Sequence, residues 1–436
     1  MIIEEIYPLF KKSTGVTTDT RTMEGGELFF ALRGENFDGN SFIRKALDNG
    51  CTGVVADDPA TAKNPRVHVV PDALEVLQQL ATHHRRQWGG KVLAITGSNG
   101  KTTTRELTAA VLSHKYKVLA SRENLNNHIG VPLTLLKLTD EEVAVIEMGA
   151  NHHGEIAMLA EIAEPDAGII TNIGKAHLEG FGSLEGVRQA KGELYDFLAA
   201  NNRPVIANMS DPKLAEMVRE RNLEYFSYGT GDGGYDVKGR FEGAGSNILG
   251  SFGWDDREFI VRSVLFGRYN FMNMLTAVAA GIWFGVKPAD ICLAIAGYQP
   301  DNNRSQLVNG KTNTLILDAY NANPTSMTAA LDEFSQREDQ RKMVILGDML
   351  ELGDHTMAEH EAVLRQLAVS SIDEVILVGE QFNTFASSPD YPFHFFISLD
   401  ACLEYLEQNR PENYLILLKG SRKNALERAT KLLQEC

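Results

Sequence analysis

Residues 96–103, with the sequence TGSNGKTT, have the types and spacing of a phosphate-binding loop. Backbone N–H groups in such a glycine-containing turn, together with the N-terminus of the helix that follows, present positive potential to phosphates. On this interpretation Lys101 reaches the β- and γ-phosphates and the Thr102 hydroxyl binds a metal ion. The general pattern has glycine at position 95, where this chain has Ile95, so the loop is a variant. The alternative interpretation is an ordinary strand, turn and helix. The predicted nucleotide contacts of the loop are Thr96, Gly97, Ser98, Asn99, Gly100, Lys101, Thr102 and Thr103.

Apolar runs alternate with helical patterns around this loop. The predicted strands cover residues 92–96, 143–148, 167–172 and 204–208. Such alternation favours an α/β fold in which a mostly parallel sheet is covered by helices on both faces. Glycine becomes frequent over residues 229–253, which predicts short strands and turns, and a helix is expected over residues 272–284.

The flanking segments have a similar organisation. Residues 1–85 contain strand-like runs at 28–32 and 53–56 and a helical segment at 77–86. Beyond residue 300, four apolar runs end at or beside Asp318, Asp348, Glu380 and Lys419. Because ligands gather at the carboxyl ends of strands in open α/β sheets, these charged residues should face a crevice. We predict three domains, at residues 1–85, 86–299 and 300–436.

The composition excludes several classes of protein. The 436 residues, 43% of them hydrophobic, are more than one core usually organises. The 58 acidic and 42 basic residues give a net charge of −16, which disfavours non-specific binding to nucleic acid or anionic membrane. Cys51, Cys292, Cys402 and Cys436 lack metal-ligand spacing and form no disulfide framework, which fits a reducing cytoplasm. Without a basic signal-peptide start or a long apolar stretch, we expect neither export nor membrane insertion.

Other segments carry a resemblance to one enzyme family. The loop and the segments EMGANHHGEI (147–156), NIGKAHLEGFGS (172–183) and AKGELY (190–195) resemble, in order and spacing, the nucleotide, metal and catalytic region of the Mur ligases and their folylpolyglutamate synthase relatives. RYNFMN (268–273) resembles the H-N-x-x-N element of the family, with Tyr269 in the place of the histidine.

Segments near both ends of the chain resemble the family member that joins D-alanyl-D-alanine to UDP-N-acetylmuramoyl-tripeptide in peptidoglycan synthesis. They are TDTR (18–21), LFFALRGENFDG (28–39), NLNNHIGVPLTLL (124–136), DAYNANPTSM (318–327), LGDMLELG (346–353), His360-Glu361 and KGSR (419–422). The resemblance implies an N-terminal domain for the UDP-sugar, a central P-loop ATPase and a C-terminal Rossmann-like domain. It also implies that ATP activates a carboxylate as an acyl phosphate, which an amine then attacks.

The resemblance further implies the catalytic and metal-binding residues. Lys101 would neutralise the γ-phosphate, while Thr102, Glu147 and His177 would bind magnesium ions, which prefer oxygen ligands. Lys191 would react with carbon dioxide, and the resulting carbamate would help to hold a second magnesium ion. From the residues alone, His177 is a surface or core histidine and Lys191 a solvated helix lysine.

The remaining predicted contacts also have simpler alternatives. Asn270 and Asn273 would bind the adenine edge or cap a helix. Arg304 would approach the phosphates or remain a surface arginine. Asp318 would accept a hydrogen bond from a ribose hydroxyl.

The predicted substrate contacts lie at both ends of the chain. Thr20, Arg21 and Gly34 would bind the uridine diphosphate, unless the DTR segment merely forms a turn. Asn126 and Asn127 would bind the peptide stem or cap the helix entered at Pro132. The incoming dipeptide would lie near Tyr320, Asn321 and Asn323, and its carboxylate would meet Lys419 and Arg422.

Three other functions remain open at this stage. Another Mur ligase or a folylpolyglutamate synthase would use the same ATP chemistry on a different acceptor. A nucleotide-binding regulator that has lost ligation would retain the loop and lose the metal ligands, whereas Glu147, His177 and Lys191 are all present. A generic P-loop switch or transport ATPase would not explain the flanking motifs. We expect a monomer, and the third residue of the tripeptide, meso-diaminopimelate or L-lysine, is not determined by the sequence.

Overall fold

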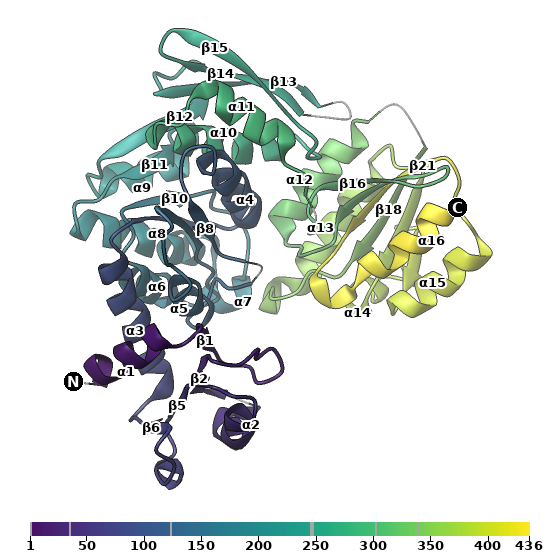
Figure 1. The fold of residues 1–436 in the computed structure, drawn as a ribbon. Coiled ribbons are helices and arrows are strands. Elements are labelled where there is room, and N and C mark those ends of the chain that lie inside the picture. Colours follow the sequence, from purple (N-terminus) through teal and green to yellow (C-terminus); the bar gives the residue numbers. More distant parts are fainter. Residues whose placement is uncertain (1, 35, 123, 245–247, 301–302, 338–340) are drawn as a thin grey trace.

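The computed structural model describes residues 2–34, 36–122, 124–244, 248–300, 303–337 and 341–436. Glu35, Asp301 and Asn302, which lie in segments discussed above, are outside the described residues. Three main sheets follow one another along the chain, each with its own helices (Figure 1). The described residues contain no helix with both the length and the apolar character needed to cross a membrane.

The N-terminal part contains a four-stranded parallel sheet with the order β1-β2-β5-β6. Phe29 and Ala31 pack with helix α2 on one face, whereas Leu28 and Phe30 face α1 and α3 on the other. The elements are α1 (Ile2–Lys12), β1 (Val16–Thr17), β2 (Leu28–Ala31), β3 (Arg33–Gly34), β4 (Phe37–Asp38), α2 (Ile43–Asp48), β5 (Gly53–Ala56), β6 (Val67–Val69) and α3 (Ala73–Trp88).

Helix α3 connects this part to the central one. Asp72 caps its N-terminus by accepting from the N–H groups of Leu74 and Glu75, and it ends at Gly89, whose φ of 76° is left-handed. Its buried residues recur on one face, and the helix contacts both α1 and the central helices α5 and α6. Figure 1 shows α3 rising from the N-terminal part to the base of the central part.

The central part contains a nine-stranded sheet with the order β15-β14-β13-β12-β11-β10-β7-β9-β8, parallel from β8 to β13 and antiparallel at β13 to β15. Alternate residues of β7 point to opposite faces, so Val92 and Ala94 pack toward α3, α5, α6 and α8, and Leu93 and Ile95 toward α4, α10 and α11. The elements are β7 (Lys91–Thr96), α4 (Lys101–Leu112), β8 (Val118–Ala120), α5 (Gly130–Leu135), β9 (Val143–Glu147), α6 (Glu155–Ala163), β10 (Ala167–Ile170), α7 (Leu178–Phe181), α8 (Leu184–Ala200), β11 (Val205–Asn208), α9 (Pro212–Glu220), β12 (Tyr225–Thr230), β13 (Val237–Ala244), β14 (Ile248–Trp254), β15 (Arg257–Ser263), α10 (Tyr269–Trp283) and α11 (Pro288–Gly297).

The C-terminal part contains a six-stranded sheet with the order β16-β17-β21-β18-β19-β20, parallel except at the β16 edge. Figure 1 shows it beside the central part, with α12 and α13 on the side that faces the central part. The elements are β16 (Gln306–Asn309), β17 (Thr314–Asp318), α12 (Pro324–Ser335), β18 (Arg341–Gly347), α13 (Thr356–Ala368), β19 (Glu374–Val378), α14 (Glu380–Asn383), β20 (His394–Phe396), α15 (Leu399–Gln408), β21 (Tyr414–Lys419) and α16 (Thr430–Glu435). The α/β class and the mostly parallel sheets predicted from the sequence are confirmed.

Candidate active site

The predicted phosphate loop joins β7 to the N-terminus of α4. Gly100 has a φ of 77° and directly precedes the first helical residue, Lys101. A Cβ atom on Gly100 would lie 2.3 Å from Oδ1 of Asn273, so a larger residue there would be both strained and obstructed. The loop therefore presents backbone N–H groups and a helix N-terminus, which is the arrangement that binds phosphate.

The segment at residues 171–174 supports the loop from behind. The Ser98 hydroxyl donates to the carbonyl of Gly174 at 3.0 Å. The carbonyl of Asn99 accepts from the Thr171 hydroxyl at 2.7 Å and from the Asn172 side chain at 2.9 Å. At the end of β7, the Thr96 hydroxyl donates to the carbonyl of Met148. These bonds fix the loop before any ligand arrives, so little ordering is left for binding.

Lys101, Thr102 and Glu147 meet at the ends of β7 and β9. The Lys101 ammonium donates to the carbonyls of Gly97 and Ser98, at 2.8 and 3.2 Å, and burial lowers the pKa of this group. Thr102 and Thr103 are buried beside it.

Glu147 is buried with both of its carboxylate oxygens engaged. Oε1 accepts from the Asn126 side chain at 2.9 Å, and Oε2 lies 3.3 Å from the buried guanidinium of Arg105. Asn126 therefore contacts a predicted metal ligand, while Asn127 accepts from the N–H groups of Ile129 and Gly130 and caps the turn into α5. That helix begins at Gly130, and the prediction that it is entered at Pro132 was wrong by two residues.

His177 lies between the central and C-terminal parts. Its backbone is left-handed, with a φ of 52°, and its Nδ1 atom lies 2.5 Å from Oε2 of Glu351, which follows β18. This contact with His177 lowers the pKa of the Glu351 carboxyl. Lys175, two residues earlier, pairs with Glu359 of α13 at 2.6 Å.

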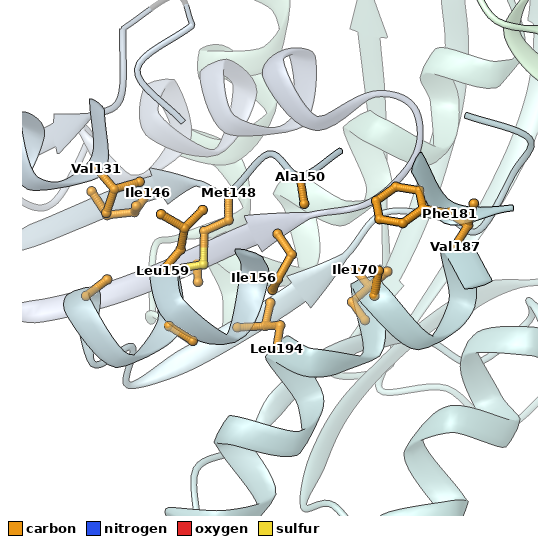
Figure 2. Packing of buried hydrophobic residues seen from close by; sticks show 14 of the residues in the cluster. Val131, Ile146, Met148, Ala150, Ile156, Leu159, Ile170, Phe181, Val187 and Leu194 are labelled. Carbon is orange, nitrogen blue, oxygen red and sulfur yellow. The ribbon is translucent and has the colours of Figure 1, made fainter. Parts of the chain in front are cut away.

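Lys191 is almost completely buried on α8. Its ammonium nitrogen lies 3.3 Å from the carbonyl of Ala150 and 5.1 Å from the ring centre of Phe181. Burial, with a smaller contribution from the charge of Lys101, lowers the pKa of Lys191 to about 7. Figure 2 shows the apolar packing here, with Ala150 and Phe181 above Ile156 and Leu194. In the solvated-lysine alternative this side chain would be exposed, and it is not.

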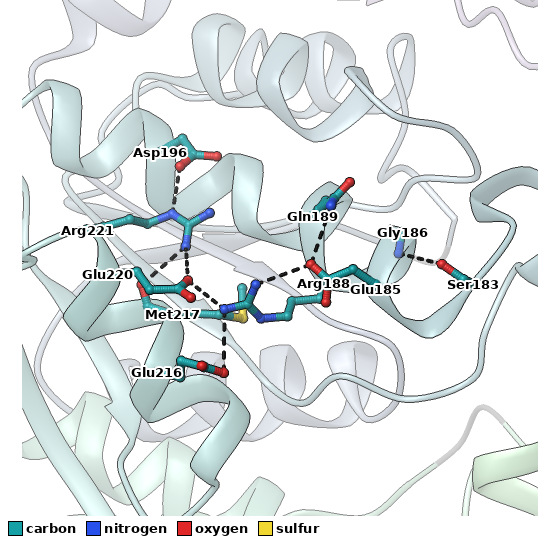
Figure 3. Close-up of polar contacts among 10 residues, drawn as sticks. All are labelled: Ser183, Glu185, Gly186, Arg188, Gln189, Asp196, Glu216, Met217, Glu220 and Arg221. Carbon is teal, nitrogen blue, oxygen red and sulfur yellow. Dashed lines mark hydrogen bonds and ion pairs between the residues drawn. The ribbon is translucent and has the colours of Figure 1, made fainter.

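The orientation of α8 is fixed on its other side by ion pairs with α9 and the turn after it (Figure 3). Arg188 pairs with Glu220 at 2.5 Å and with Glu216 at 3.6 Å, and Arg221 pairs with Asp196 at 2.6 Å. The Ser183 hydroxyl caps the helix by accepting from the N–H of Gly186. These contacts hold the register of α8 and therefore the position of Lys191.

The predicted adenine contacts are buried at the start of α10. The Asn270 side chain donates to the carbonyl of Phe266 and to the Ser305 hydroxyl, and the Asn273 side chain donates to Oδ1 of Asn270 at 2.7 Å. Neither residue caps the helix. Tyr269, in the histidine place, lies with its hydroxyl 3.1 Å from that of Ser305, and burial raises its pKa well above the usual value.

Tyr320, which follows β17, has two arginines over its ring. The guanidinium carbon of Arg304 lies 3.7 Å from its ring centre, and that of Arg422 lies 5.1 Å away. The hydroxyl donates to Oδ1 of Asn124 in the central part at 2.8 Å. Arg304 is close enough to Lys101 for its charge to lower the pKa of that lysine. Two cations are therefore stacked on one ring at the edge of the phosphate loop.

The ends of β17 and β21 meet through Asp318 and Lys419. The Lys419 ammonium lies 2.5 Å from Oδ2 of Asp318 and is almost completely buried. Asn321 accepts from the N–H of Ala322. Asn323 caps α12 and also donates to the Asn99 side chain of the phosphate loop at 2.7 Å. The capping residue of a C-terminal helix thus contacts the nucleotide loop directly.

One cavity of about 500 Å³ brings most of these residues together. Its walls come from both the central and the C-terminal parts. The predicted residues that line it are Ser98, Asn99, Gly100, Lys101, Thr102, Thr103, Asn126, Asn127, Glu147, His177, Asn270, Asn273, Arg304, Asp318, Tyr320, Asn321, Asn323 and Lys419.

The predicted residues in the N-terminal part lie apart from this cavity. The exposed guanidinium of Arg21 pairs with Asp19 at 2.6 Å, and Asp19 also accepts from the backbone N–H of Arg21, so the DTR segment forms a turn. Thr20 is buried, and Gly34 lies in the short strand β3. Lys191, Arg422, Thr96 and Gly97 border the site without lining the cavity.

The sequence did not single out Arg105, Asn124, Ser305 or Glu351 as site residues. Arg105, one turn after Lys101 on α4, contacts Glu147. Ser305, just before β16, contacts Asn270. Asn124 and Glu351 reach theirs only because two parts of the chain come together. Glu351 lies inside the quoted LGDMLELG segment and Asn124 begins the quoted NLNNHIGVPLTLL segment, and these positions were the available signals.

Comparisons with known proteins agree along the chain. The Mur ligase middle domain matches residues 95–281, the Mur ligase glutamate ligase domain matches 303–422, and the Mur ligase family catalytic domain matches 12–85. The UDP-N-acetylmuramoyl-tripeptide--D-alanyl-D-alanine ligase of Bacillus subtilis is 37% identical, over 97% of this chain and 93% of the relative.

Solved structures give the same result. The crystal structure of MurF from Acinetobacter baumannii matches with a TM-score of 0.89 and 31% identity, over 99% of this chain and 98% of that one. The MurF ligase of Thermotoga maritima in complex with ADP matches with a TM-score of 0.84 and 25% identity, over 98% of both chains.

Proposed function

The chain belongs to the Mur ligase family, and from this premise we infer that it joins D-alanyl-D-alanine to UDP-N-acetylmuramoyl-tripeptide in peptidoglycan synthesis. It is an ATP-dependent ligase that releases ADP and phosphate. The observation that carries this inference is near full-length identity above 30% to ligases of that name. We expect the reaction to occur in the cavity that is lined by both the phosphate loop and the C-terminal strand ends.

The reaction requires two successive transfers. The terminal carboxylate of the tripeptide attacks the γ-phosphorus of ATP, forming an acyl phosphate and releasing ADP. The amine of D-alanyl-D-alanine then attacks the acyl carbon, phosphate leaves, and the nitrogen loses a proton. Phosphoryl transfer depends mainly on positioning and charge neutralisation, for which the backbone N–H groups of the loop and Lys101 are suited. The charge of Arg304 near Lys101 supports the same role.

Magnesium ions would be held by Thr102, Glu147 and His177. Among the described residues no group of three or more His, Cys, Asp or Glu side chains is arranged to hold a metal ion. Magnesium does not require such a group, because it keeps several waters and usually takes one or two carboxylates together with substrate phosphates. A buried carboxylate at Glu147 beside the Thr102 hydroxyl fits that donor set. The bound ion would neutralise charge on the transferring phosphoryl group.

A carbamate at Lys191 would provide a further anionic ligand. Only an uncharged amine reacts with carbon dioxide, and a lysine with a pKa of about 7 is about half uncharged at neutral pH and mostly uncharged above it. The amine contacts the Ala150 carbonyl and the Phe181 ring, and among the described residues no carboxylate lies within ion-pair distance of it, although Glu155 and Glu193 are close enough to raise its pKa slightly. Burial and the low pKa together support this proposal.

Of the two arginines on Tyr320, Arg422 would bind the carboxylate of the dipeptide, whereas Arg304 would approach the phosphates. Lys419 is less suited to that role, because its ammonium is already paired with Asp318. We assign Lys419 instead to the orientation of Asp318, which would accept from a ribose hydroxyl. Asn270 and Asn273 would lie against the adenine, Asn127 against the peptide stem, and Tyr320, Asn321 and Asn323 against the dipeptide.

The uridine diphosphate would lie along the N-terminal part at Thr20, Arg21 and Gly34, which do not line the cavity at the phosphate loop. A long nucleotide-linked peptide would extend from these residues to the cavity. We propose that the enzyme acts as a monomer and in the cytoplasm, where ATP is available.

A coupled ATPase assay tests the function. Phosphate release should require UDP-N-acetylmuramoyl-tripeptide and D-alanyl-D-alanine together. Release driven instead by a folate with glutamate would overturn the proposal in favour of a folylpolyglutamate synthase. Tripeptides with meso-diaminopimelate or L-lysine at the third position, compared in the same assay, would identify the stem that the enzyme accepts.

A further inference from the structure

A turn of the C-terminal part, residues 348–353, reaches across to the segment that carries His177. The carbonyl of Glu351 accepts from the backbone N–H of Glu179 at 3.1 Å. The carboxylate of the same residue lies 2.5 Å from Nδ1 of His177. One residue therefore makes both a backbone and a side-chain contact with residues 177–179.

This turn is held in place by its own part of the molecule. The N–H of Met349 donates to Nε2 of the buried His360, and the N–H of Leu350 donates to the Ser421 hydroxyl. Glu351 then takes a left-handed conformation, with a φ of 61°. These bonds aim the partly exposed carboxylate at His177 without help from a ligand.

The contact bears on which nitrogen of His177 keeps its lone pair. Oε2 of Glu351 approaches Nδ1 at ion-pair distance without the geometry of a hydrogen bond. Because a carboxylate can only accept, its charge favours, in the neutral ring, the tautomer with the proton on Nδ1 and the lone pair on Nε2. Within the part of the chain that the structure describes, nothing hydrogen-bonds Nε2. Histidines that bind metal ions commonly donate their other ring N–H to a carboxylate, which fixes the tautomer and the orientation of the ring.

We propose that Glu351 is a positioning residue for the divalent cation: supplied by the C-terminal part, it holds His177 with Nε2 directed at the metal site. The proposal rests on the assignment of His177 as a metal ligand in the proposed function. It makes the cation site dependent on docking of the C-terminal part. By reciprocity, the cation favours the docked arrangement.

Binding of Mn²⁺ alone to the full-length enzyme, measured from the EPR signal of the free ion, tests this without turnover. Glu351→Ala should raise the dissociation constant of Mn²⁺ by about 10- to 100-fold, the range found for lost partners of metal-binding histidines. Glu351→Gln should give a smaller increase, because its amide oxygen can accept from Nδ1 but has no charge. Unchanged binding in both variants overturns the proposal.

Glu359→Gln is the matched control. It removes another ion pair between the same two parts, Lys175 with Glu359, and leaves His177 untouched. Its Mn²⁺ affinity should equal that of the unmodified enzyme. An equal loss in Glu359→Gln and Glu351→Ala would mean that docking alone matters, which overturns the positioning role.

Two further measurements separate failure of this proposal from failure of the proposed metal site. If His177→Ala and Glu147→Gln both bind Mn²⁺ normally, the metal site itself is wrong and the proposal fails with it. If they lose affinity and Glu351→Ala does not, only the present proposal fails. The ¹⁵N NMR spectrum of His177 should show one fixed tautomer that becomes a mixture in Glu351→Ala, and a mixture in the unmodified enzyme contradicts the proposal.

Discussion

At the scale of single residues, Lys191 has an environment that suits chemistry more than stability. The side chain is buried against Phe181 and Ala150, and no carboxylate in the described part of the chain lies within ion-pair distance of it. Lys191→Ala should abolish ligation, and a short alkanoic acid should restore part of it by supplying a carboxylate in the space left by the side chain. Phosphate release with both substrates present measures the effect.

Lys191→Arg separates a carbamate from a simple positive charge. Arginine remains charged and forms no carbamate, so this variant should be as inactive as Lys191→Ala. Substantial turnover in Lys191→Arg, or unimpaired turnover in Lys191→Ala, would contradict the assignment.

The ring of Tyr320 makes cation–π contacts with two arginines, Arg304 and Arg422. Tyr320→Ala removes the ring under Arg304 and Arg422, and each cation–π contact stabilises by about 0.5–2 kcal/mol. The KM for D-alanyl-D-alanine should therefore rise by roughly tenfold or more. Tyr320→Phe keeps the ring and loses the hydrogen bond to Asn124, so in this variant the KM for D-alanyl-D-alanine should rise only a few-fold. Equal effects in the two variants, in steady-state kinetics, would show that the ring has no role.

At the scale of elements, the turn after β18 depends on a histidine that must remain neutral. His360 Nε2 accepts from the N–H of Met349 and Nδ1 donates to the carbonyl of Thr356, so protonation would break the first bond. Burial lowers the pKa of His360 below its ordinary 6.5. The unfolded chain then binds a proton before the folded one does, and this group makes stability fall as the pH drops below about 6.5.

Thermal unfolding between pH 5 and 7.5 tests that expectation. His360→Gln retains an acceptor and has no titrating ring, so its Tm should fall less on acidification than that of the unmodified enzyme. Parallel Tm curves for the two proteins would exclude the histidine as a source of the pH dependence.

Local elements were predictable from the sequence where a single segment contains the cause. The apolar run at 92–96 lies in β7 and most of the stretch at 272–284 lies in α10. Both were predictable because the spacing of their apolar residues indicates which face of a strand or helix is buried. The half-exposed edge strands β16 and β20 have no such pattern and were not predicted. Glu351 was missed as a site residue for a different reason: its contact with His177 depends on how two parts pack, which no local pattern records.

At the scale of the whole molecule, a buried ion pair fastens α3 to the central part. Asp166 lies 2.8 Å from Arg85 of α3, and both side chains are about nine-tenths buried. Asp166→Ala should lower the stability by about 3–5 kcal/mol, because it leaves the Arg85 charge buried without its carboxylate and also removes the contacts of Asp166 with Lys91, Arg203 and the N–H of Val92. Urea or thermal denaturation measures the loss.

Asp140→Ala is the control for that experiment. Its partner, Lys117, is exposed, and so is Asp140 itself, so the Tm should hardly change. Similar shifts for Asp166→Ala and Asp140→Ala would show that the pair on α3 adds no more than a surface contact.

The shared walls of the cavity have a thermodynamic consequence. The phosphate loop belongs to one part, the strand ends with Asp318 and Tyr320 to another, and Asn99 already bonds to Asn323 across the boundary. A nucleotide and a dipeptide that each touch both walls both favour the same docked arrangement. Their affinities are then cooperative even if the two molecules never meet, and each must strengthen the binding of the other by the same factor.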